Sequence, residues 1–132
     1  MKSNHDYARG LVLKAEHDFQ MATLGLEHEG PPDTICFHLQ QTVEKLLKAL
    51  LVVHDIDYPL SHDLPALLAL VAGVAPELEN FRQALGPFAS YAVEMRYEPL
   101  ITPDRQEALA AFQTTKELRA VLHRLLPKEV LP

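Results

Sequence analysis

The stretch DTICFHLQQTVEKLLKALLVVH, residues 33–54, decides the fold class. Its apolar residues recur every three or four positions, which is the spacing of one face of an α-helix. That apolar face consists of Ile35, Leu39, Val43, Leu46, Leu50 and Val53. The opposite face carries His38, Gln41, Lys45 and Lys48. We predict a helix over 33–54, capped by Asp33 and supported by an i,i+4 pair of Glu44 with Lys48.

Prolines and glycines divide the rest of the chain into further helices, because both residues end or start helical segments. Gly30-Pro31-Pro32 ends a helix over about 5–28, and Ser61 or Asp63 caps another over 64–71. Gly86 separates two short segments, 76–85 and 87–97. Thr102-Pro103-Asp104 starts the last helix, which Pro127 closes. With no alternating stretch long enough for a strand, we predict an all-α antiparallel up-and-down bundle of four to five helices.

Length and composition narrow the class of protein. The 132 residues suit a single domain spanning 1–132, and 48% hydrophobic residues exclude a disordered chain. A net charge of −6 argues against a free-standing nucleic-acid binder, which needs clustered Lys and Arg. The first ten residues contain no apolar signal core, and no uncharged stretch is long enough to span a bilayer. We expect a soluble, cytoplasmic protein.

Three common kinds of site find little support in the sequence: a phosphate-binding loop, a reactive cysteine and a metal site. Five scattered glycines supply no phosphate-binding loop, which argues against nucleotide-fold enzymes of the P-loop or dinucleotide type. The single Cys36 lies in an apolar helix, so we expect a small core residue. The segment containing His54, Asp55, Asp57, His62 and Asp63 has no spaced ligand signature for a metal. We expect capping and turn roles there, and no metal or cofactor.

Two sets of residues are candidates for ligand binding. His38, Gln41, Lys45 and Lys48 form a polar stripe that is either a solvated helix face or a surface for a ligand or partner. Tyr91, Arg96 and Tyr97 place an arginine between aromatic rings, an arrangement that stacks on bases and grips phosphate. The same arginine is also suited to clamp a nearby carboxylate such as Glu94 or Glu98.

Four blocks of the sequence resemble one family. They are KAEHDFQMA at 14–22, CFHLQQTVEKLLKALL at 36–51, SHDLPALL at 61–68 and YAVEMRY at 91–97. Together they are similar to the HEPN domain, the "higher eukaryote and prokaryote nucleotide-binding" helical bundle, from about residue 7 to residue 126. The resemblance implies a bundle of four or five helices that commonly dimerises. It also implies a minimal nucleotidyltransferase as partner, in a toxin–antitoxin or nucleotide-handling system.

Some members of this family are metal-independent endoribonucleases with an arginine and a histidine four to six residues apart. In that chemistry the histidine acts as acid or base, and the arginine stabilises the phosphorane charge. No histidine follows Arg96 in that window. Arg119 and His123 are the nearest match, but only three residues separate them, and a solvated pair near the end of the last helix explains them as well.

We therefore expect a non-catalytic module that binds a nucleotide or a nucleotidyltransferase partner. Its candidate ligand-binding residues are His38, Gln41, Lys45, Lys48, Tyr91, Arg96 and Tyr97. A homodimer would use leftover apolar residues around the broken fourth helix, namely Phe81, Phe88, Met95 and Leu100. Two alternatives remain: an endoribonuclease toxin acting as a dimer, with Arg96 or Arg119 joined by a histidine from elsewhere, and a purely structural adaptor.

Overall fold

A computed structural model describes residues 3–92, 99 and 102–132, and those residues form helices and loops without a strand. The long helices are α1 (Asn4–Glu27), α2 (Pro32–Val53) and α5 (Arg105–Leu125), with a shorter α3 (Leu64–Ala72). The described residues also form short 3-10 helices. These are η1 (Pro76–Phe81) and η2 (Gly86–Tyr91) after α3, and η3 (Lys128–Val130) after α5. The predicted all-α bundle is confirmed.

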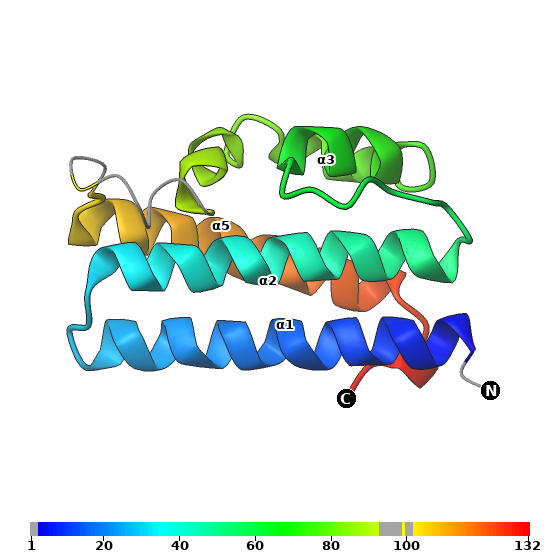
Figure 1. Cartoon of the computed structure of the whole chain (residues 1–132), viewed down its shortest axis with the longest axis horizontal. Helices are drawn as coiled ribbons and strands as arrows, with labels where there is room; N and C mark the ends of the chain where they lie inside the picture. Colours follow the sequence, from blue (N-terminus) through cyan, green and yellow to red (C-terminus); the bar gives the residue numbers. More distant parts are fainter. Residues whose placement is uncertain (1–2, 93–98, 100–101) are drawn as a thin grey trace.

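Helix α2 is the centre of the bundle. It packs against α1 on one side, against α5 behind it, and against α3 and η2 on the remaining side (Figure 1). Over half of its residues are buried, including the polar Gln40, Thr42 and Glu44. The predicted apolar face is buried except for the partly buried Val53, and the polar stripe of His38, Gln41, Lys45 and Lys48 is partly buried because burial extends beyond the apolar face to Gln40, Thr42 and Glu44.

The helix starts follow local capping chemistry at three of four helices. Ser3 and Asp6 form a capping box at α1, Asp63 accepts from the amide of Ala66 at α3, and Asp104 accepts from that of Glu107 at α5. Within the predicted start signal Thr102-Pro103-Asp104, the residue that caps α5 is Asp104.

Helix α2 has no side-chain cap. Pro31 is its N-cap residue and Pro32 opens its first turn, so Asp33 lies inside the helix and the predicted Asp33 cap is wrong.

Helices α1 and α2 end on residues with left-handed backbone. Glu29 has a φ of 54° and Asp55 a φ of 57°. The amide of Gly30 then donates to the carbonyl of Gly25, and the amide of Ile56 donates to that of Leu51, as in a Schellman motif. The sequence offered Gly30 as the stop of α1, but the left-handed position belongs to its neighbour.

The region after α3 differs most from the prediction. Helices expected over 76–85 and 87–97 are 3-10 turns, Pro76–Phe81 and Gly86–Tyr91, and the residues 93–98 lie outside the described part. Phe88 is 1% exposed and Phe81 is partly buried against the core. Phe88 is therefore a core residue, not part of an open dimer surface, whereas Met95 and Leu100 lie outside the described residues.

Candidate functional site

The polar stripe on α2 is organised by two carboxylates. The first is Asp18 of α1, whose side chain is 12% exposed. It contacts Nδ1 of His38 at 2.8 Å and also accepts a hydrogen bond from Nζ of Lys45. Antiparallel packing of α1 on α2 places these residues opposite each other, although 20 and 27 positions separate them. The histidine and lysine are thus already paired across the helix interface.

The second carboxylate is Glu44, on α2 itself and only 5% exposed. It accepts hydrogen bonds from Nε2 of Gln40 at 3.0 Å and from Nζ of Lys48 at 3.1 Å. Nδ1 of His62 lies 2.8 Å from its Oε1 atom. The predicted pair of Glu44 with Lys48 is confirmed, and the loop before α3 adds a histidine to it. A buried carboxylate with three partners holds this part of the bundle together.

These contacts bear on the two interpretations of the polar stripe, a solvated helix face or a surface for a ligand or partner. The side chain of Lys48 is 14% exposed and that of Lys45 is 23% exposed, so the stripe is not a solvated face. Gln41 donates to Gln40, 2.7 Å away, and so extends the same network. A role for His38, Gln41, Lys45 and Lys48 in ligand binding stays a prediction. A ligand there would compete with carboxylates of the protein itself.

A third carboxylate joins the two residues proposed as the weak catalytic pair. Glu16 of α1 accepts two hydrogen bonds from Nε and Nη2 of Arg119, with shortest distances of 2.9 Å and 2.8 Å. Nε2 of His123 lies 2.8 Å from Oε1 of the same carboxylate. The guanidinium carbon also lies 4.8 Å from the ring centre of Phe19, which stacks on Phe112.

Arg119 and His123 therefore join α5 to α1 through Glu16. Nothing in the sequence alone marked Glu16 as their partner. A bidentate carboxylate on the arginine leaves its charge neutralised inside the fold. A catalytic role for the pair stays a prediction.

Of the three residues predicted to form an aromatic clamp, Tyr91, Arg96 and Tyr97, the structure describes only Tyr91. Tyr91 is 1% exposed, its ring lies 5.3 Å from that of Phe88, and its hydroxyl donates to Glu107 of α5. Burial and the neighbouring Glu107 raise the pKa of Tyr91. Its ring is therefore part of the core and not of a base-stacking surface. Arg96 and Tyr97 lie outside the described residues.

Cys36 is buried, as predicted, and burial raises the pKa of its thiol to about 12. Such a thiol stays protonated and unreactive at neutral pH. In the described part of the chain, no group of three or more His, Cys, Asp or Glu side chains is arranged to hold a metal ion. Asp63, in the loop between α2 and α3, caps α3, in agreement with the capping role expected for it.

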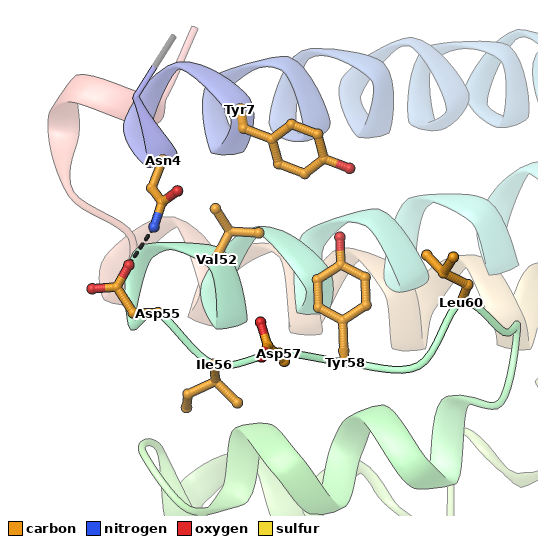
Figure 2. Close-up of a pocket in the computed structure, with 8 residues that line it drawn as sticks. All are labelled: Asn4, Tyr7, Val52, Asp55, Ile56, Asp57, Tyr58 and Leu60. Atoms are coloured by element: carbon orange, nitrogen blue, oxygen red, sulfur yellow. Dashed lines mark hydrogen bonds between the residues drawn. The ribbon is translucent and has the colours of Figure 1, made fainter. Parts of the chain in front are cut away.

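A concave feature lies beside the loop between α2 and α3. A cavity of about 470 Å³ opens between the start of α1, the end of α2 and residues 55–60 (Figure 2). The residues that line it are Asn4, Tyr7, Val52, Asp55, Ile56, Asp57, Tyr58 and Leu60. Sequence reasoning missed this cavity, because its two tyrosines stand 51 positions apart and meet only when α1 packs on α2.

Comparison with known families gives the class of this protein. The family model of the HEPN domain matches residues 8–125 of the 132-residue chain. The chain therefore belongs to the HEPN domain family, as the four sequence blocks indicated. Searches of curated proteins and of solved structures return no match. Among the described residues, none of the helices combines the length and apolar character needed to cross a membrane.

Proposed function

We propose that this HEPN-family chain is a non-catalytic binding module that holds a protein partner in the cytoplasm. The expected partner is a minimal nucleotidyltransferase in a toxin–antitoxin-like pair. The observation that supports a protein ligand over a nucleotide is the internal pairing of the α2 cations. Asp18 engages His38 and Lys45, and Glu44 engages Lys48. A phosphate at this stripe would displace a carboxylate that is itself mostly buried, which is costly.

Titration calorimetry tests the choice between protein and nucleotide. The purified chain is titrated with ATP, AMP, GTP and a short RNA at low and at physiological salt. We expect no heat of binding from any of the four, because His38, Lys45 and Lys48 of α2 are already paired with carboxylates of the fold. Micromolar binding of a mononucleotide, lost on Arg96→Ala, would instead make the chain a nucleotide module. Cleavage of the RNA would favour the endoribonuclease alternative.

Recovery of the partner tests the other half of the proposal. The tagged chain is expressed in its native host, and proteins that remain bound at physiological salt are identified by mass spectrometry. We expect a nucleotidyltransferase at a stoichiometry near one to one. Unrelated proteins in its place would support the adaptor alternative, and recovery of the chain alone would contradict partner binding.

Self-association is part of the same proposal, and exposed apolar residues of α1 are its candidate surface. Leu13, Met21 and Leu24 are 45%, 52% and 41% exposed along the outer side of this helix. Exposed leucines at helical spacing are typical of a helix that packs on another copy or on a partner. Light scattering should find a dimer that Leu24→Glu dissociates. A monomer at high protein concentration would remove self-association and leave partner binding intact.

A further inference from the structure

The cavity beside the loop after α2 combines exposed apolar surface with aromatic rings. Tyr7 is 57% exposed and Leu60 is 98% exposed, so two large side chains stand in solvent at one opening. In Figure 2 the side chains of Val52, Asp57 and Tyr58 point toward α1, and the Tyr7 ring faces them from that helix. Burial and the neighbouring hydroxyl of Tyr7 raise the pKa of Tyr58 to about 12. Exposed large apolar side chains around a concavity indicate a binding surface.

The backbone fixes the wall of this cavity. Asp55 takes the left-handed conformation that ends α2, and the amide of Ile56 bonds back to the carbonyl of Leu51. Nδ2 of Asn4 donates to Asp55, which ties the start of α1 to the turn. The cavity is therefore held by contacts from both helices, and a ligand would meet a surface that is already formed.

The described residues that line the cavity carry negative charge and no positive charge. Asp55 and Asp57 line it, while no Lys or Arg does. Asp57 makes no hydrogen bond or ion pair with any residue in the described ranges. Lys48 lies 5.4 Å from the ring centre of Tyr58, but its ammonium group is already bound to Glu44. Among the described residues that line the cavity, none is a cation, so a positively charged side chain of a partner would complement it.

We propose that this cavity binds an arginine side chain presented by a protein partner. A guanidinium is planar, so it stacks on an exposed tyrosine ring while its N–H groups pair with a carboxylate. The Asp57 carboxylate would accept hydrogen bonds from the guanidinium, and the Tyr7 ring would stack on it. Leu60 would cover the apolar methylene groups of the arginine side chain. The inference rests on the proposed function, since it names the surface that a protein partner uses.

The experiment uses a blocked tripeptide, acetyl-Ala-Arg-Ala-amide, titrated into the ¹⁵N-labelled full chain up to about 10 mM and followed by NMR. The comparison ligand replaces arginine with citrulline, which has nearly the same shape and no charge. We expect saturable shifts at residues 4–7 and 55–60 with the arginine peptide, and about fivefold weaker binding with citrulline. No shift with either peptide, or equal shifts with both, would overturn the proposal.

Two variants separate the cavity from general electrostatic attraction. Asp57→Asn should weaken the arginine peptide about fivefold, the loss expected for one partly exposed ion pair. Glu77→Gln removes the same charge at an exposed position of η1 and should leave the affinity unchanged. Equal weakening by both variants would show that only net charge attracts the peptide. Circular dichroism confirms that each variant is folded before it is titrated.

Failure of this inference and failure of the proposed function give different results. If Asp57→Asn recovers as much nucleotidyltransferase as the wild-type chain, partner binding stands and the arginine site is overturned. If the peptide binds at the cavity while the wild-type chain recovers no nucleotidyltransferase, the arginine site stands and the proposed partner is wrong.

Discussion

Replacing Glu44 with glutamine tests whether internal pairing holds the polar stripe of α2. The variant keeps the shape of the side chain but removes a charge at a position where only 5% of the side chain is exposed. Lys48, 14% exposed, then loses its anionic partner, and His62 loses a charged acceptor. Breaking a buried ion pair costs roughly 3–5 kcal/mol, and the half-exposed His62 sets the expected loss near the lower end, about 3 kcal/mol.

The expected loss is large enough for an ordinary melting experiment. An unfolding entropy of about 2.1 cal/mol/K per residue gives about 0.28 kcal/mol/K for 132 residues. A loss of about 3 kcal/mol therefore lowers Tm by about 11 °C. Urea unfolding followed by far-UV circular dichroism gives the free energy independently, provided that the slope with denaturant is unchanged.

The matched control is Glu79→Gln, which removes the same charge from an exposed pair with Arg82 on η1. Exposed pairs of this kind contribute little, so we expect no measurable change in Tm. The reasoning is refuted if the two variants lose the same stability. In that case the carboxylates do not hold the basic side chains of α2, and those side chains are free to bind a phosphate.

Four further predictions concern the backbone and the thiol. Gly10→Ala should stabilise α1 by about 1 kcal/mol, because nothing lies within 4 Å of the added Cβ. Gly25→Ala should destabilise by about 1 kcal/mol, because its Cβ would lie 2.7 Å from Cγ1 of Ile35; paired urea titrations measure both. Glu29→Gly should raise Tm by about 3–4 °C in calorimetry, because it relieves a left-handed backbone at φ 54°. The Cys36 thiol, with its pKa raised to about 12, ionises in the unfolded chain first. Stability from this group is complete below about pH 8.5 and is lost as pH rises toward 12, so Cys36→Ala should flatten the alkaline decline of the unfolding free energy.

The boundaries of most helices were predictable because their signals are local. Asp63 before Leu64, with Gly73 after Ala72, marks both ends of α3 within eleven residues. Such signals depend on backbone amides a few positions away, so they need no knowledge of the fold. Prediction failed where two local signals competed. Pro31 displaced Asp33 from the cap of α2, and the prolines at 76 and 87 opened only 3-10 turns.

The candidate site was predictable only as a set of residue types. His38, Lys45 and Lys48 were identified from their spacing, and Glu44 was predicted as the partner of Lys48, but Asp18 was not predicted as the partner of His38 and Lys45. Glu16 meets Arg119 across 103 positions, and nothing local distinguishes it from any other acid on a helix surface. The family resemblance supplied the fold and the expected class of partner. Which charged side chains are paired with each other was decided by the packing of α1 on α2 and α5.

By itself, then, the amino-acid sequence determined helix positions, the all-α class and the HEPN family, because capping, periodicity and motif blocks are properties of short segments. Only the tertiary structure decided which cations are paired, that Phe88 and Tyr91 are core residues, and that two distant tyrosines frame an acidic cavity. Side-chain pairing across helices depends on their relative rotation and register. That geometry is set by the whole core at once, and no single segment encodes it.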